Sequence, residues 1–324
     1  MGRFMARRLA FFLVTLWMTS VMIFLLVRVL PGDVARVILG RDASETQVEA
    51  KREELGLNDP LFVQYFTWIT DFVRGDWGES FAFRGQDIRE LVTQRLVNSA
   101  RLGLISMLIA IPVSITLGVI AGLTEGKLPD NLISVFSLSV VSLPEFVTGL
   151  FLINTVALKW ADNPIAEKIG WFPSSSAVRA DASFRDALPS LWLPAIAATL
   201  VLLAYIARLT RAGVIEEKKS EYVRTAVLKG LPYPVVIFKH ILRNALLPTV
   251  TVIAISTGWL ISGLVVIEFV FGYPGLGSLL ITAIERRDLP MIQAVVMVTV
   301  SVILIANFVA DLLYAALNPR ITLN

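Results

Sequence analysis

The chain has 324 residues, a mean hydropathy of +0.71 and 17% charged residues, compared with about 25% in a soluble domain. Its apolar residues form long blocks, which indicates a membrane protein with several spans and excludes a large soluble core. The net charge of +3 is too small to indicate a nucleic-acid partner. The sequence has no Cys, which excludes disulfides and thiolate chemistry, and its one His excludes His-rich metal sites and most His-based triads.

Six apolar blocks approach or exceed the roughly 17–25 residues that a helix needs to cross the hydrocarbon. They cover about residues 9–28, 102–123, 132–158, 191–209, 245–268 and 289–312. The first block follows a basic start but lacks a cleavage site, so we expect an uncleaved span rather than a signal peptide. The sequence therefore predicts an all-α integral membrane protein with six transmembrane helices in a single domain, residues 1–324.

The distribution of basic residues predicts how these helices are oriented, because Lys and Arg concentrate in short cytoplasmic loops. With the N-terminus inside, the short inner segments hold 13 Lys and Arg residues and the short outer loops hold six. We therefore expect both termini in the cytoplasm and the long segment 30–100 outside.

The outer segment 30–100 is expected to be helical. Its first helix opens with Ser44 and Gln47 in capping-box spacing. The next is expected to have Asp59 as N-cap and Pro60 at its first position, followed by a broad aromatic and apolar face. Two interpretations of that face stay open: the helix lies in the outer membrane–water interface, or it packs against the spans. A third helix, capped by Asp87, is expected to run into the second span.

The third block contains an acidic residue, Glu145, about 14 residues from its start. An ionisable residue inside a membrane span indicates a functional position, and the adjacent Pro144 is expected to kink the helix toward a cavity. Glu145 could face the transport pathway and meet cationic groups of a substrate. The alternative is a structural carboxylate that pairs with a neighbouring helix or a partner chain.

The loop "FGYPGLGSLLITAIERRDLP" is rich in turn residues, and Asp288 can N-cap the last span. We expect a short, rigid re-entrant structure at the outer mouth, where Glu268 and Arg287 could form a pair. A purely structural cap for the last span is the alternative.

Residues 210–244 form a charged segment between two spans. Ser220 can cap a helix that starts at Glu221, Gly230 suits the C′ position, and Pro232 blocks continuation. Such a short helix is unstable alone in water. Its apolar stripe and basic rim suit docking in a groove of another protein, while a solvated connector is the alternative.

The sequence offers no nucleotide-binding loop. "AGLTEGKL" has Gly126 and Lys127 but lacks the first glycine and the hydroxyl residue of a phosphate-binding loop. A transport function would therefore need an energy source on another chain.

"EYVRTAVLKGL" followed by "VIFKHILRNALLPTV" resembles the EAA motif of ATP-binding cassette importer permeases, with Gly230 at the motif glycine. The segments "LPGDVARVILG", "LGLNDPLFVQYFTWITDFVRGDWGES" and "VVIEFVFGYPGLGSLLITAIERRDLPMIQAVV" resemble the first permease subunit of dipeptide, oligopeptide and nickel importers. Val227, Leu228 and Pro232 depart from the common pattern, which alters the helix exit more than the docking face.

This resemblance implies a type I importer permease in a bacterial or archaeal cytoplasmic membrane, which imports peptides by alternating access. It implies a homologous second permease, two ATPases that carry ATP and Mg, and a periplasmic or lipid-anchored substrate-binding protein as partners. The chain itself would be no enzyme and hold no cofactor or metal. The implied ATPase-coupling residues are Glu221, Tyr222, Val223, Arg224, Thr225, Ala226 and Gly230. The implied outer gate and binding-protein contacts are Glu268, Tyr273, Pro274, Gly275 and Asp288.

Three alternatives remain open at this point. The same machinery could carry nickel chelates or another small solute. An ion-coupled secondary carrier would need more buried charge or paired broken helices, and neither is visible. A membrane-embedded enzyme lacks candidate catalytic groups.

Overall fold

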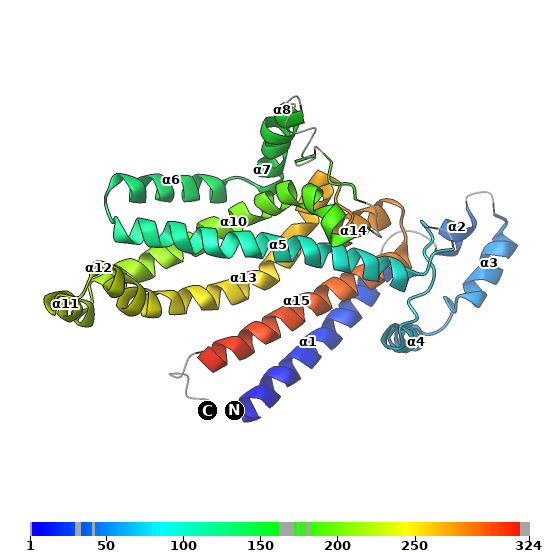
Figure 1. The fold of residues 1–324 in the computed structure, drawn as a ribbon. Coiled ribbons are helices and arrows are strands. Elements are labelled where there is room, and N and C mark those ends of the chain that lie inside the picture. The colour runs from blue at the N-terminus through cyan, green and yellow to red at the C-terminus, as the bar shows by residue number, and fades with distance from the viewer. Residues whose placement is uncertain are drawn as a thin grey trace. The chain divides into compact units, whose positions relative to one another are not determined.

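The computed structural model describes residues 2–29, 34–40, 43–83, 85–161, 172–173, 175–178 and 182–317 (Figure 1). Regular structure in these ranges is helical, apart from an isolated bridge between Glu79 and Asp87. Three of the described helices are long and apolar enough to cross a membrane, or up to six if each of three bent helix pairs is one span. The predicted all-helical class is confirmed, and the number of spans stays a prediction.

The chain divides into two compact units. The first contains the described residues up to Asn98 together with Gly275–Phe308, and the second contains those of Ser99–Pro274 and the end of the last helix. Helices of the first unit are α1 (Gly2–Val29), α2 (Val34–Leu39), α3 (Glu45–Glu54), α4 (Leu61–Arg74), the start of α5 (Ile88–Leu123), α14 (Leu276–Glu285) and most of α15 (Leu289–Leu317).

In the first unit α1 and α15 run antiparallel. The rings of Phe12 and Phe308 lie 5.7 Å apart, whereas Val27 at the other end of α1 belongs to an apolar cluster with Met291. The first and last predicted spans therefore pack on each other along their length.

The predicted local signals of the outer segment are largely confirmed. Ser44 and Gln47 form a complete capping box at the start of α3, and Asp87 accepts hydrogen bonds from the backbone at the start of α5. The N-cap predicted for α4, Asp59, lies one residue before the observed N-cap. Pro60 takes that position with an extended backbone, and the helix begins at Leu61 rather than Pro60.

Helix α4 uses its aromatic residues on two faces. Tyr65 is buried, its hydroxyl lies 2.7 Å from that of Ser20, and its ring meets Phe24 of α1 edge-on at 5.6 Å. Phe62 and Phe66 on the other side are exposed. One face thus packs against the first span, as one interpretation expected, and the other remains available to the membrane interface.

The second unit contains the remaining α5, the α6 helix (Leu128–Ser142), α7 (Glu145–Leu152), the π-helical η1 (Ile153–Ala157), α8 (Leu158–Ala161), α10 (Phe184–Lys218), α11 (Glu221–Leu228), α12 (Tyr233–Val235), the π-helical η2 (Val236–Ile241) and α13 (Leu242–Phe271). In Figure 1 the helices α5, α6, α10 and α13 run side by side, and α11 lies at one end of this group. Within the unit α10 packs extensively on α13 and also on α6.

Glycines let these helices approach closely. A Cβ atom on Gly118 of α5 would lie 2.6 Å from the carbonyl oxygen of Ala207 on α10, and one on Gly213 of α10 would lie 2.6 Å from that of Ala245 on α13. Small residues at crossing points are the usual device for packing helices in a membrane.

The predicted third span, 132–158, is not one straight helix. It breaks at Leu143 and Pro144, and the helices on either side meet at 107°. The Pro144 ring fixes φ and removes the amide donor, so the chain turns there and a new helix starts at Glu145. The kink expected at Pro144 is therefore a full break.

Candidate functional site

Helix α11 covers Glu221–Leu228, close to the predicted bounds. Ser220 occupies the N-cap position, but its hydroxyl donates to the carbonyl of Glu217, so the predicted side-chain cap is not formed. Gly230 has φ +74° and donates to Val227, while the next amide reaches back to Ala226. This is the Schellman arrangement that the glycine predicted.

Two residues on the inner face of α11 hold it to the second unit. Val223 and Ala226 are only 4% and 5% exposed. They pack in an apolar cluster with Val214 of α10 and with Ile241 and Ala245, where η2 passes into α13. The sequence resemblance implied both as ATPase-coupling residues. In the structure they hold the helix to its own chain, and a coupling role for them stays a prediction.

Tyr222 adds a polar connection between the same elements. Its hydroxyl bonds to the carboxylate of Glu217, accepts from the Asn244 amide at 2.9 Å and lies 3.3 Å from the carbonyl oxygen of His240. Burial raises the pKa of the phenol, and the bond to Glu217 adds to this, so Tyr222 stays protonated and can donate. The side chain therefore ties α11 to both the end of α10 and the start of α13.

The exposed residues of α11 are Glu221, Tyr222, Arg224, Thr225, Val227 and Leu228. Leu228 is 79% exposed, and Phe238 in the following η2 is 72% exposed. Large apolar side chains so open to solvent, next to an arginine, are typical of a protein-binding surface.

A buried ion pair lies behind this site, and sequence reasoning missed it. Asp130, at the start of α6, accepts two hydrogen bonds from Arg211 of α10, at 2.5 and 2.8 Å. It also accepts from the amide of Gly126 at 2.9 Å. These bonds hold the pKa of Asp130 well below its usual range. The pair holds the α5–α6 turn against α10 at Arg211, ten residues before α11 begins. A surface pair between Lys219 and Glu125, at 3.0 Å, joins the same two elements.

Glu145 stands in the first turn of α7, partly buried. Its two carboxylate oxygens lie 3.2 Å from where a Cβ atom of Gly263 on α13 would be, so the glycine leaves room for the acid. A role of Glu145 and Pro144 in a substrate pathway stays a prediction.

The residues predicted at the outer mouth are mostly buried. In the second unit, Glu268 and Tyr273 are each 1% exposed, and Glu268 accepts a 2.5 Å hydrogen bond from Ser99, while Pro274 is partly buried. In the first unit Gly275 is buried and Asp288 is inaccessible.

Asp288 forms the N-cap of α15 as predicted, accepting from Met291, and it also accepts from the Ser80 hydroxyl at 2.6 Å. Contact of these five residues with a binding protein stays a prediction, as does the Glu268–Arg287 pair, which would join the two units.

Comparison with known proteins decides the family. Residues 114–323 match the family described as "binding-protein-dependent transport system inner membrane component", and residues 1–83 match its N-terminal membrane component. The chain belongs to this family. The first match includes the whole of α11, and the second includes α1 to α4. The permease is therefore a membrane subunit of a binding-protein-dependent transport system, as its sequence resemblance implied.

Curated relatives match the permease along almost its whole length. A probable peptide ABC transporter permease of Sinorhizobium fredii is 36% identical over 99% of both chains. The glutathione transport system permease proteins of Shigella flexneri and Escherichia coli K12 are 37% and 36% identical over the same share. A crystal structure of an amino acid ABC transporter superposes with a TM-score of 0.50 at 15% identity, covering 70% of the permease and 94% of that chain, which supports the fold alone.

Proposed function

We propose that the permease is the transmembrane subunit of an ATP-driven importer for short peptides. It would pair with a homologous second permease and receive cargo from an extracytoplasmic binding protein. Two ATPase subunits would bind ATP and Mg and perform the hydrolysis. The peptide and glutathione permeases among its relatives support this cargo class, since glutathione is itself a short peptide.

The observation that carries the proposal is the two-sided construction of α11. Its inner face is anchored by Val223, Ala226 and Tyr222 to α10 and α13, while Arg224 and Leu228 point away from the chain. A movement of the exposed face would therefore be transmitted to α10 and α13, which pack extensively on each other. A solvated connector needs no such anchoring and gains nothing from an exposed leucine.

The proposed mechanism is alternating access. Closure of the ATPase pair on ATP would move α11, and α10 and α13 would follow as rigid elements, opening the pathway outward. Four spans are predicted before α11 and two after it. With α11 in the cytoplasm, both chain ends would therefore lie in the cytoplasm as well, in agreement with the distribution of Lys and Arg.

Charge reversal on the exposed face tests the coupling role. Arg224→Glu should lower binding-protein-stimulated ATPase activity of the assembled complex by about tenfold or more, because the complementary surface would then repel it. Arg74→Glu, at the exposed end of α4, is the matched control and should keep wild-type stimulation. Wild-type stimulation in an Arg224→Glu complex that assembles normally would refute the role of α11.

A further inference from the structure

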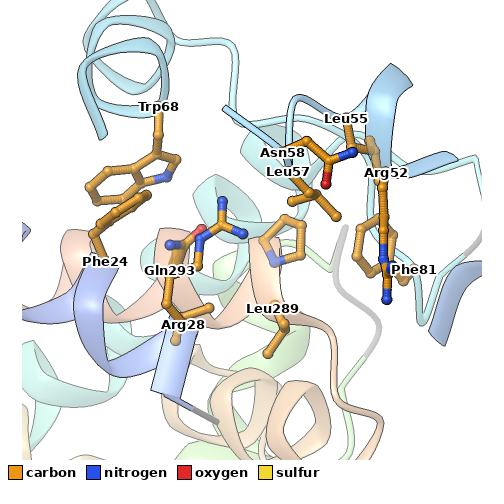
Figure 2. A pocket seen from close by; sticks show the side chains of 12 residues that line it. Phe24, Arg28, Arg52, Leu55, Leu57, Asn58, Trp68, Phe81, Leu289 and Gln293 are labelled. Carbon is orange, nitrogen blue, oxygen red and sulfur yellow. The ribbon is translucent and has the colours of Figure 1, made fainter. Parts of the chain in front are cut away.

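The first unit contains a cavity of about 500 Å³ that has no part in the coupling role proposed for α11. The last two turns of α1, the α3–α4 connection and the start of α15 line it. Figure 2 shows Trp68 beside Phe24 on one side, with Arg28 and Gln293 next to them. Leu57 and Asn58 face them from the α3–α4 connection. The volume lies within the range of small-molecule sites.

The charge of the cavity is positive. Arg28 and Arg52 both line it, and no Asp or Glu does so among the described residues. Arg52 bonds to Glu49 at 3.0 Å, which offsets its charge. Arg28 instead lies over the ring of Phe24, 5.3 Å from its centre, an arrangement that needs none of the guanidinium's N–H donors. Within the described part of the chain, no carboxylate pairs with it.

Apart from the amides of Asn58 and Gln293, the remaining wall is apolar and aromatic. Phe24 and Trp68 belong to a cluster of aromatic rings that continues through Phe72 to Trp77. The rings of Phe72 and Trp77 stack with their centres 4.9 Å apart. Arg28 stands in the last turn of the first apolar helix, the level at which arginine and aromatic side chains contact lipid headgroups. Such a wall can pack against the apolar part of a ligand, and the guanidinium can bind an anionic group on the same ligand.

We propose that this cavity binds the anionic group of an amphiphile, with Arg28 as its counter-charge and Trp68 against its apolar part. The amphiphile could be a phospholipid, bound through its phosphate, or a short apolar peptide, bound through its carboxylate. Binding of a peptide rests on the proposed function, whereas binding of a phospholipid does not.

The phospholipid source is tested on the full-length permease, purified with the subunits that accompany it. The complex is placed in bilayers of equal parts phosphatidylcholine and phosphatidylglycerol, and retained lipid is counted by native mass spectrometry. The wild type should retain phosphatidylglycerol preferentially. Arg28→Gln should lower that preference about tenfold, the effect of losing one charge-assisted hydrogen bond. Arg28→Lys should keep part of it, and the matched control Arg74→Gln should keep all of it.

The peptide source is tested in bilayers of phosphatidylcholine alone. An apolar dipeptide with a free carboxylate should bind, its C-terminal amide should bind about tenfold more weakly, and Arg28→Gln should remove this difference. Carboxylate-dependent binding without a lipid preference would assign the cavity to peptides. The proposal is overturned if the wild type shows neither preference, or if Arg28→Gln retains the wild-type preferences. Neither readout uses the stimulated ATPase activity by which Arg224→Glu tests the coupling role, so failures of the two proposals are distinguishable.

Discussion

Replacing Asp130 with Ala should disconnect the α5–α6 turn from the helix that leads into α11. The side chain is 2% exposed and accepts two bonds from Arg211, one from Gly126 and one from Ser134 at 3.3 Å. The substitution leaves Arg211 without its counter-charge and the Gly126 amide without its acceptor.

The structure sets the size of this effect. Removing one member of a buried ion pair costs about 3–5 kcal/mol when the remaining charge stays buried. The Arg211 side chain is 33% exposed, so water can solvate part of its charge, and we expect a loss near the lower end, about 3 kcal/mol. The surface pair of Lys219 and Glu125 is far more open, and Lys219→Ala should cost less than about 1 kcal/mol.

Thermal unfolding of the detergent-purified permease measures both changes. Asp130→Ala should lower Tm by several degrees, and Lys219→Ala should leave it nearly unchanged. Because its folded pKa is depressed, Asp130 stabilises the protein at full strength above about pH 4, where the unfolded carboxyl is ionised. That stabilisation is lost as the pH falls toward the folded pKa, so the difference between wild type and variant should narrow only under acid conditions. Equal Tm values for the two variants at neutral pH would refute the reasoning.

Two further substitutions test packing in each unit by the same unfolding measurement. Gly118→Ala would place a Cβ atom 2.5 Å from that of Thr210 and should cost about 1–3 kcal/mol, whereas Gly103→Ala, whose nearest neighbouring atom would lie at 3.4 Å, should be tolerated. A tolerated Gly118→Ala would mean that α5 and α10 do not approach so closely. Asp288→Ala removes the buried cap of α15 and its bond to Ser80 and should cost about 2–4 kcal/mol. An unchanged Tm for Asp288→Ala would show that this cap and its bond to Ser80 do not stabilise the start of α15.

Local signals in the sequence predicted much of the fold. Ser44 with Gln47, Asp87, Asp288 and Gly230 each mark a helix end, because capping depends on residues within one turn. The apolar blocks fall within helices, except where Pro144 breaks the third one, since burial in lipid demands both apolarity and helical hydrogen bonding.

Long-range packing could not be predicted from the sequence. Asp130 and Arg211 are 81 residues apart, and no local pattern connects them. The eight-residue α11 is too short for its periodicity to show whether Val223 and Ala226 face the chain or a partner. The family resemblance placed Glu268 and Asp288 at an outer gate, which stays a prediction. No local pattern showed that each accepts a buried hydrogen bond from a distant residue of its own unit.

Site-directed cross-linking tests most directly whether a separate ATPase acts on α11. The permease has no Cys, so Leu228→Cys provides a single thiol for a short photoactivatable maleimide within the assembled complex. The account predicts a covalent product with the ATPase subunit, identified by peptides of its ATP-binding motif, and none from Phe62→Cys on the exposed face of α4. No ATPase product from a fully labelled Leu228→Cys complex, or equal products from both positions, would contradict it.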